Sequence, residues 1–310
     1  MSIIVSLLTQ VLHIGLMLVA APTLAGAMAW LDARLAGRSG PPFLLPWRDL
    51  RRLSRKTPSM MENVSVVSHL APAAGLGATL AAAALVPSFT LGMALSPLAD
   101  VLVITALLTL ARVAGALAAL DSGDAMPGLM AQRSSAMAVL AEPALMLSVV
   151  ALALMAGSFN LDQIVGQQRE GILLPAAASA VVLTALVALI FADTSTADAS
   201  TADRGAESLC CGTDLAMARM TEWLRRLIWV GLTGGLFLPV GMATADAGPI
   251  GWVIGLASWA CKLGFFVVCV SGVQTLVGRI QRDSLPDLIG VAALLALLAI
   301  IMILASAGTA

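Results

Sequence analysis

The sequence is poor in charge and in aromatic side chains. Charged residues make up 11% of its 310 residues, whereas a soluble domain averages about 25%. Tyrosine is absent, and 7 Phe and 6 Trp are too few to build the stacking platforms that hold nucleic-acid bases. The formal net charge is -1, so no basic surface for a phosphate backbone is expected. Nucleic acid is therefore excluded as a partner.

Cysteine is also scarce. Cys210 and Cys211 are adjacent in a polar stretch, while Cys261 and Cys269 lie in an apolar one. No pair has the C-x-x-C spacing of an iron–sulfur or zinc site, so we expect no metal site on this chain. Any redox centre that serves this protein is then expected on another protein.

Apolar residues are abundant, at 59% of the chain, which is more than a soluble fold of this size can bury. Eight apolar stretches are long enough to cross a hydrocarbon core of about 30 Å. They lie near residues 3–30, 64–88, 97–120, 136–157, 172–192, 221–243, 249–276 and 285–307. The sequence therefore predicts an all-α polytopic membrane protein, one integral membrane domain over residues 1–310 built as a bundle of eight transmembrane helices.

Basic residues fall on one side of this arrangement. The loops after odd-numbered spans, with their flanks, carry Arg34, Arg38, Arg48, Arg51, Arg52, Arg55, Lys56, Arg133, Arg204, Arg219, Arg225, Arg226, Arg279 and Arg282. The loops of the other side carry Arg169. Because cytoplasmic loops of membrane proteins are enriched in Lys and Arg, we expect the arginine-rich loops in the cytoplasm and both termini outside.

The segment 41–56 after the first span combines prolines with arginines. Its first half cannot be helical, because proline removes a donor and biases the preceding residue toward extended geometry. From Pro46 onward, Trp47, Leu50 and Leu53 recur every three residues, which predicts a short helix lying on the cytoplasmic interface. The alternative is a basic loop that is merely attracted to anionic lipid.

Three charged residues lie within predicted spans: Arg112 in the third, Glu142 in the fourth and Lys262 near the middle of the seventh. A charge in hydrocarbon costs about 2.5 kcal/mol or more, so such residues face a protein interior or water. At 1.5 Å per residue, Arg112 lies roughly 12 Å and Glu142 roughly 9 Å from the cytoplasmic surface. These two are a candidate ion pair. The three charges either line an ion path or only lock the bundle.

Other polar residues lie nearer the ends of spans. Asp100 begins the third span and Asp121 ends it. Pro143 follows Glu142 and is expected to weaken the helix there, leaving carbonyl groups for water or a cation. His13 is expected to be a hydrogen-bonded packing residue.

Five motifs follow one another along the chain. They are Gly-Pro-Pro-Phe-Leu-Leu-Pro-Trp-Arg-Asp-Leu (40–50), Ala-Leu-Asp-Ser-Gly (119–123), Ala-Glu-Pro-Ala-Leu (141–145), Gly-Thr-Asp-Leu-Ala (212–216) and Arg-Ile-Gln-Arg-Asp-Ser-Leu-Pro-Asp-Leu (279–288). In this order the chain resembles the formate hydrogenlyase subunit 4 family, also called hydrogenase-4 component C. That family belongs with the subunit 1 family of respiratory complex I. The resemblance covers essentially the whole chain.

The resemblance implies a membrane protein with no catalytic residue, cofactor or metal ligand of its own. The implied partners are hydrogenase large and small subunits, iron–sulfur subunits and antiporter-like membrane subunits. The nickel–iron ([NiFe]) centre and the iron–sulfur clusters would lie on those partners. The implied location is the cytoplasmic (inner) membrane of a bacterium or archaeon.

The resemblance also implies roles for particular residues. Glu142 matches the family glutamate of the fourth span, Asp121 the loop aspartate before it, and Arg112 an arginine of the third span. With Lys262 and Asp100, these form the set of ion-coupling candidates. The candidates for docking a partner are Trp47, Arg48, Asp49, Arg51 and Arg52, because segment 41–56 matches the region that meets the hydrogenase arm.

Two departures from the family pattern weaken the coupling role. Residues 193–211 are poor in acids where relatives have a longer acidic loop, and Gln274 stands where relatives commonly have glutamate. A glutamine cannot exchange a proton near neutral pH. Three functions stay open: an ion-coupling subunit of a membrane-bound hydrogenase, a quinone-site subunit of an NADH-quinone oxidoreductase, and a purely structural anchor.

Overall fold

The protein is a bundle of long helices, shown here by a computed structural model that describes residues 3–57, 65–169, 181–182, 184–185, 210–239, 241–244, 248–276 and 285–308. The helices are α1 (Ile3–Leu35), α2 (Leu45–Leu53), α3 (Val66–Leu85), α4 (Val101–Asp121), α5 (Ala125–Ala156), α6 (Leu161–Arg169), α9 (Thr213–Phe237), α10 (Gly248–Leu276) and α11 (Leu285–Gly308). A 3-10 turn covers Ser96–Leu98, and strands β1 (Thr90–Leu91) and β2 (Ala243–Thr244) form a two-residue parallel pair.

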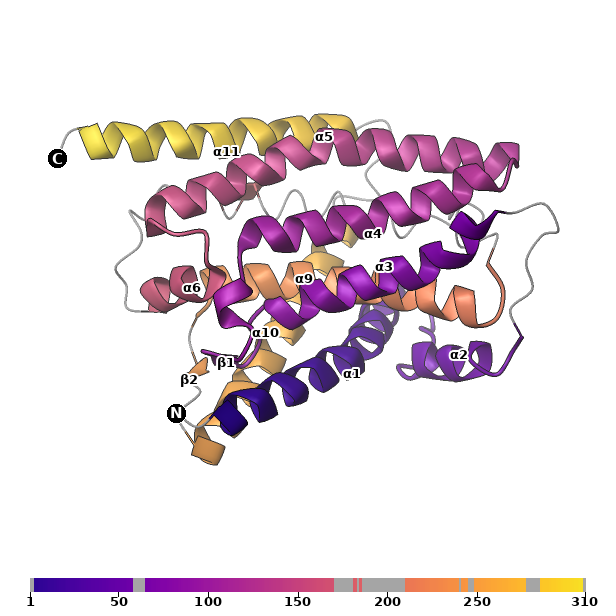
Figure 1. Ribbon diagram of the computed structural model, residues 1–310, viewed down its shortest axis with the longest axis horizontal. Coiled ribbons are helices and arrows are strands. Elements are labelled where there is room, and N and C mark those ends of the chain that lie inside the picture. The colour runs from indigo at the N-terminus through magenta and orange to yellow at the C-terminus, as the bar shows by residue number, and fades with distance from the viewer. Residues whose placement is uncertain are drawn as a thin grey trace.

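The bundle has two distinct ends (Figure 1). The short helix α2 lies at one end, which we call the α2 end. Helix α1 begins and α11 ends at the other, which we call the far end, where α6 and β1 also lie. The long helices run between the two ends.

Within the described part of the chain, six helices are long and apolar enough to cross a membrane. They correspond to the first, second, third, fourth, seventh and eighth expected spans. The span expected at 172–192 lies almost wholly outside the described residues. The span expected at 221–243 exists as α9, but it begins at Thr213 and carries five charged residues. The polytopic helical fold is thus confirmed, and the number of eight spans stays a prediction.

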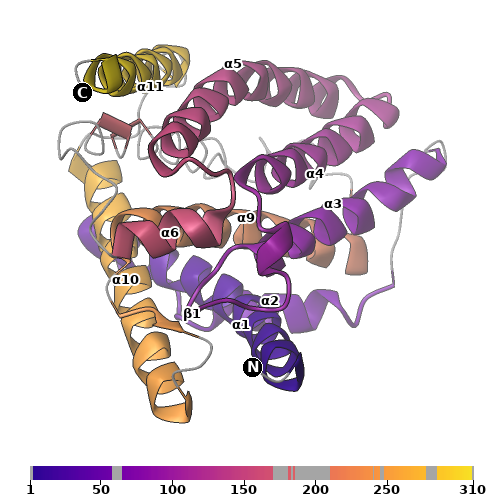
Figure 2. The ribbon, with the colours of Figure 1, turned by 60° about the vertical axis from the view of Figure 1, so that its left-hand side comes forward.

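Helix α9 forms the centre of the packing. It contacts α1, α2, α3, α4, α6 and α10, while α5 packs between α4 and α11. Figure 2 shows α11 and α10 at the outside of this arrangement and α5 curving over α4. A proline inside a helix breaks one backbone hydrogen bond and bends the helix, and Pro143 is such a residue in α5.

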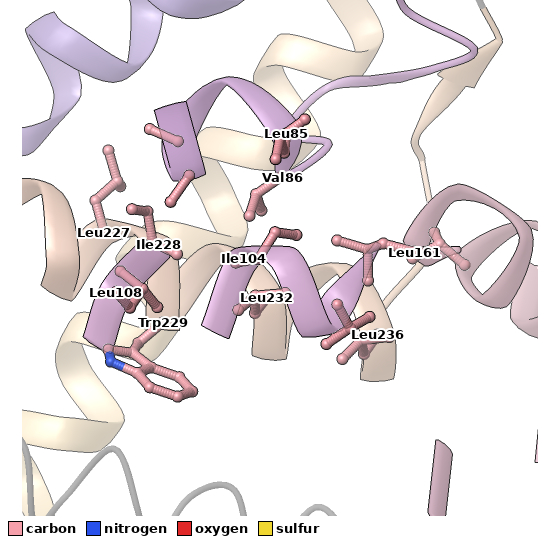
Figure 3. Close-up of a cluster of buried hydrophobic side chains, with 14 of the residues drawn as sticks. Leu85, Val86, Ile104, Leu108, Leu161, Leu227, Ile228, Trp229, Leu232 and Leu236 are labelled. Carbon is pink, nitrogen blue, oxygen red and sulfur yellow. The ribbon is translucent and has the colours of Figure 1, made fainter. Parts of the chain in front are cut away.

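The hydrophobic core lies between α9 and the helices packed on it. Ile104 and Leu108 from α4 meet Leu227, Ile228 and Leu232 from α9 (Figure 3). In contrast, the outer faces of α10 and α11 expose apolar residues such as Ile250, Val253, Leu294 and Ile301. Contiguous exposed apolar surface of this kind is expected where a helix faces lipid.

The far end is closed by hydrogen bonds between two connecting segments. The Asp162 carboxylate accepts from the backbone N–H of Gly92 at 2.7 Å and from the hydroxyl of Ser96. The Asn160 amide donates to the Ser96 carbonyl at 2.9 Å. These bonds join the segment that precedes α4 to the start of α6.

Candidate functional site

Helix α2 and the residues that hold it form the most distinctive surface of the α2 end. Pro46 stands in its first turn, where a missing N–H costs no helical hydrogen bond. Leu53 is buried and Trp47 and Leu50 are half-buried, as their spacing predicted. The expected short helix after the first span is therefore confirmed.

A glycine in α1 brings the proline-rich loop onto the bundle. A Cβ atom built on Gly26 would lie 2.1 Å from the carbonyl oxygen of Phe43, closer than any side chain permits. Gly40, in the loop itself, approaches α1 in a similar way, with 3.0 Å between its built Cβ and the Trp30 carbonyl oxygen. The loop before α2 thus lies directly against the backbone of α1.

One ion pair and a second close approach hold α2 on α9. Asp49 lies 3.7 Å from the Arg219 guanidinium of α9 and 3.7 Å from that of Arg52. At the start of α9, Gly212 has a φ of 62°, and its built Cβ would lie 2.6 Å from the Thr57 carbonyl oxygen. Both ends of α2 are therefore fixed.

The docking candidates divide into two groups in the structure. Asp49 pairs with Arg219 of α9 and so positions the helix, while Trp47 is half-buried. Arg48, Arg51 and Arg52 are exposed, next to exposed Phe43 and Leu44. The free face of α2 therefore combines positive charge with apolar contact area, which suits an acidic protein surface or an anionic membrane surface.

The first half of α9 contains charged residues that the sequence analysis assigned to a loop and its flank rather than to a helix. Arg225 is paired with Glu222 at 2.9 Å, and both Asp214 and Arg225 are buried. The Nε of Arg219 is buried without a hydrogen-bond acceptor among the described residues. The i, i+3 spacing of Glu222 and Arg225 is the sequence signal that points to a helical pair here. Arg219 links this charged half of α9 to Asp49 of α2.

Arg112 and Glu142 are half-buried on neighbouring helices, but no ion pair joins them among the described residues. Glu142 lies further into its helix than the apolar run predicted, because α5 begins at Ala125 rather than near residue 136. Glu142 lies 17 residues into α5, whereas Arg112 lies nine residues from the end of α4. The difference offsets the two side chains by about 12 Å along the helical hairpin.

Asp100 and Asp121 stand at opposite ends of α4 and accept structural hydrogen bonds. Asp100 is the N-cap and accepts from the Leu102 backbone N–H at 2.8 Å. Asp121 accepts from the backbone N–H of Ser65 at 2.8 Å and from the Ser68 hydroxyl at 2.7 Å. Asp121 thus joins the end of α4 to the start of α3.

His13 is fully buried and hydrogen-bonded, as predicted for a packing residue. Its Nε2–H donates to the Ala83 carbonyl at 2.9 Å, and its Nδ1 lies 2.7 Å from the Ser88 hydroxyl. Gln10 donates to the Ala84 carbonyl at 2.9 Å. These side chains of α1 bind carbonyl groups that the last turn of α3 leaves without helical partners.

Lys262 lies midway along α10 and lines a small cavity together with residues of α9. Gln274 lies near the end of α10, while residues 193–209 of the acid-poor segment fall outside the described residues. Within the described part of the chain, no three His, Cys, Asp or Glu side chains are grouped to hold a metal ion.

The whole chain has known relatives. The NADH dehydrogenase family matches residues 7–305. Formate hydrogenlyase subunit 4 of Escherichia coli K12 is 28% identical over 297 residues, covering 92% of this chain and 95% of that protein. Hydrogenase-4 component C of the same organism is 28% identical over 244 residues, covering 74% of each.

The fold is also known from a solved structure. A chain of the membrane-bound sulfane sulfur reductase, an archaeal respiratory membrane complex, superposes with a TM-score of 0.75 at 20% sequence identity. The match covers 96% of this chain and 99% of that one. The two chains therefore share their fold.

Proposed function

The chain belongs to the NADH dehydrogenase family, and on that basis we propose that it is the membrane subunit of a membrane-bound [NiFe]-hydrogenase complex of the formate hydrogenlyase type. In this role it anchors the peripheral hydrogenase to the bilayer and couples electron transfer there to the movement of protons or sodium ions. Two relatives named for formate hydrogenlyase and hydrogenase-4 support the choice of complex.

The observation that carries the proposal is the fixed position of α2. A short helix attached to a membrane bundle only by lipid contact would not hold a constant orientation. Here Gly26, Asp49 and Gly212 fix it to α1 and α9, while the arginines of its free face stay exposed. Such a preorganised charged face lowers the cost of binding a rigid partner.

The proposal places the α2 end in the cytoplasm and both termini outside, in the cytoplasmic (inner) membrane. The basic residues of α2 support this orientation through the positive-inside rule. The partners are then the hydrogenase large and small subunits and the iron–sulfur subunits at α2, with antiporter-like membrane subunits beside the bundle. The [NiFe] centre and the iron–sulfur clusters belong to those partners.

For ion coupling we propose Glu142 as the main carrier residue. It lies near the middle of α5, directly before Pro143, and a carboxylate at that depth normally faces water or protein. Arg112 lies near the middle of the adjacent α4. The charged half of α9, which Arg219 joins to Asp49 of α2, is then the element through which a redox event at α2 acts on the bundle.

The complex can be identified by extraction in mild detergent. The tagged protein is taken from its native membrane, resolved on a native gel, and its companions are identified by mass spectrometry. Co-migration with hydrogenase and antiporter-like subunits is the expected result. Co-migration with the subunits of an NADH-quinone oxidoreductase would contradict the hydrogenase assignment and support a quinone-site subunit. A chain that migrates alone would contradict both.

The coupling role is tested by Glu142→Gln in the assembled complex. We expect about tenfold slower ion movement per hydrogen turned over, since removal of a proton-transfer group typically costs at least that. Assembly and hydrogen chemistry with a soluble electron acceptor should persist. Normal ion movement in an assembled Glu142→Gln complex would support the purely structural anchor instead.

A further inference from the structure

The last turns of α1 place an aromatic ring and a positive charge on the outside of the α2 end, where α1 contacts α2 (Figure 1). Trp30 is 40% exposed, and the guanidinium carbon of Arg34 lies 5.3 Å from the centre of its ring. Helical side chains lean toward the N-terminus of their helix, so Arg34 folds back along α1 onto the indole. Its N–H donors remain for an oxyanion, because a ring contact uses the face of the guanidinium. Asp32 is two residues from each of them and therefore lies on the other side of the helix.

A second arginine follows where α1 ends. Gly37 has a φ of 70°, and the Arg38 backbone N–H donates to the Ala33 carbonyl at 2.8 Å, so the chain turns back over the last turn of the helix. Arg34 and Arg38 are both exposed, and neither has an ion-pair partner among the described residues. The outer end of α1 therefore carries two guanidinium groups whose charge no described carboxylate neutralises.

The loop after this turn runs back along α1 and brings apolar side chains beneath the two arginines. The Phe43 backbone lies against Gly26, eight residues before Arg34 in α1, which is about 12 Å along the helix axis toward the membrane centre. Phe43 is 45% and Leu44 is 52% exposed. Exposed apolar groups thus lie deeper in the membrane than the positive charges.

This order of groups corresponds to that of a phospholipid in the leaflet at the α2 end. The headgroup layer of a bilayer is roughly 5–8 Å thick on each side of the hydrocarbon core, and tryptophan is enriched in it. Arg34, folded back onto Trp30, lies at the level of a phosphate, while Phe43 and Leu44 lie at the level of the upper acyl chains. A protein that docks from outside the bilayer would reach the arginines but not the apolar groups beneath them, so a lipid fits this surface better.

The outer face of α1 continues this surface toward the far end. Val19 and Trp30 are eleven residues apart, about three helical turns, so they lie on one side of the helix. Exposed apolar residues continue from there at helical spacing, namely Val19, Val11, Leu8 and Ile4. An acyl chain that starts beside Trp30 therefore meets apolar surface along its length.

We propose that the outer end of α1 binds one anionic phospholipid through Trp30, Arg34 and Arg38. The two guanidinium groups hold the phosphate, and the acyl chains lie on Phe43, Leu44 and the outer face of α1. A lipid of net negative charge is preferred, because the ammonium group of a phosphatidylethanolamine would lie among like charges. The site goes beyond the proposed function and does not depend on a hydrogenase partner.

Lipid selectivity is tested by native mass spectrometry of the full-length protein, released from nanodiscs of phosphatidylethanolamine with increasing phosphatidylglycerol. We expect the wild type to retain phosphatidylglycerol in preference. Arg34→Gln and Arg38→Gln should each need about fivefold more of it for the same occupancy, the factor that one arginine near an anionic lipid contributes. The matched control is Arg55→Gln, which removes an exposed charge just after α2 and should bind like the wild type. An equal loss in Arg55→Gln, or no preference in the wild type, would overturn the site.

The position of the lipid is tested by fluorescence quenching, because bromine atoms on an acyl chain quench an indole that they contact. Phosphatidylglycerol brominated near its ester end should quench the wild type more strongly than phosphatidylethanolamine brominated at the same place. Trp30→Phe should abolish this difference, and the matched control Trp252→Phe on α10 should keep it. A difference that persists in Trp30→Phe would place the lipid elsewhere and overturn the site.

A protein occupant would give another result. In the native complex, Arg34→Gln should leave the set of subunits unchanged. Loss of a subunit from this variant, with unchanged binding of phosphatidylglycerol, would assign the surface to a protein and overturn the lipid site. Arg34→Lys keeps the positive charge and should bind the lipid nearly like the wild type, since lysine also binds phosphate. Elution in gel filtration at the position of the wild type shows that each variant is folded.

Discussion

The contact between Gly26 and Phe43 shows how a single residue sets the position of a functional element. Helix α1 passes under the proline-rich loop at Gly26, and the backbone of the loop occupies the space of a side chain there. Since the loop leads directly into α2, the orientation of the docking face depends on the absence of one methyl group. Under the proposed docking role, Gly26 therefore acts by positioning the exposed arginines of α2.

Gly26→Ala is expected to push the loop away from α1. The built Cβ lies 2.1 Å from a backbone oxygen, and such overpacking typically costs about 1–3 kcal/mol. The free energy of unfolding in detergent micelles, measured by equilibrium denaturation, should fall by that amount. Gly15→Ala on the same helix, with nothing within 4 Å of its Cβ, is the control and should be neutral or slightly stabilising, because alanine favours a helix more than glycine does. Equal stabilities of the two variants would contradict the close approach.

Sequence reasoning reached only part of this residue-scale detail. The three-residue spacing of Trp47, Leu50 and Leu53 predicted α2 because helical periodicity is local. The contacts of Gly26 with Phe43 and of Asp49 with Arg219 were not predictable, because they join segments brought together only by the fold. Arg112 and Glu142 were placed correctly in their spans, but their offset depends on where a helix begins, which apolar content alone does not fix.

Helix α4 shows how two acids can hold an element at both ends. Asp100 caps its first turn, and Asp121 joins its last turn to the start of α3. A carboxylate in such a position has a structural reason to be there. Whether it also carries ions can be separated from its capping role by substitutions that keep the hydrogen bond and remove the charge.

Asp100→Asn is expected to keep both stability and ion movement, because asparagine caps a helix about as well as aspartate. Asp100→Ala should lower the free energy of unfolding by about 1 kcal/mol, the typical value of a lost N-cap. Equilibrium denaturation and ion movement in the assembled complex check the two parts. A loss of ion movement in a stable Asp100→Asn variant would show that the charge itself is needed.

The helix boundaries of α5 and α9 explain why the elements were predicted less well than the fold class. The apolar run of the fourth span starts near residue 136, yet α5 begins at Ala125 and continues through Pro143. Similarly, α9 includes the charged residues from Asp214 to Arg226, which looked like a loop flank. Neighbouring helices support the polar residues in both cases, and in α9 ion pairs do so as well, which a hydropathy pattern does not reveal.

At the scale of the molecule, the exposed basic face of α2 makes docking sensitive to charge. Replacing Arg48, Arg51 and Arg52 together by Glu should weaken co-purification of the hydrogenase subunits at least tenfold, since like charges across an interface cost several kcal/mol. Arg169→Glu on α6, at the far end, is the matched control and should have no effect. Unchanged co-purification of the triple variant at low salt would show that α2 is not the docking face.

The two ends of the bundle also predict topology. Helix α1 begins and α11 ends at the far end, and the arginine-rich α2 end is expected in the cytoplasm. Alkaline phosphatase fused after Ala310 should then be active, and the same enzyme inserted after Arg38 should be inactive. Green fluorescent protein placed at the same two positions should show the reverse pattern. Fluorescence from the C-terminal fusion would invert the proposed orientation.

The charged first half of α9 has a consequence for how the protein is made. With five charged residues, this helix is poorly suited to enter lipid alone, because each charge near a helix centre opposes insertion by roughly 2.5–3.5 kcal/mol. Its neighbours α1, α2, α3 and α4 all precede it in the chain, and Asp49 of α2 already offers an opposite charge to Arg219. We therefore expect α1 to α4 to be inserted first and to stay next to the translocon during synthesis. Helix α9 then enters the membrane in contact with these helices rather than with lipid.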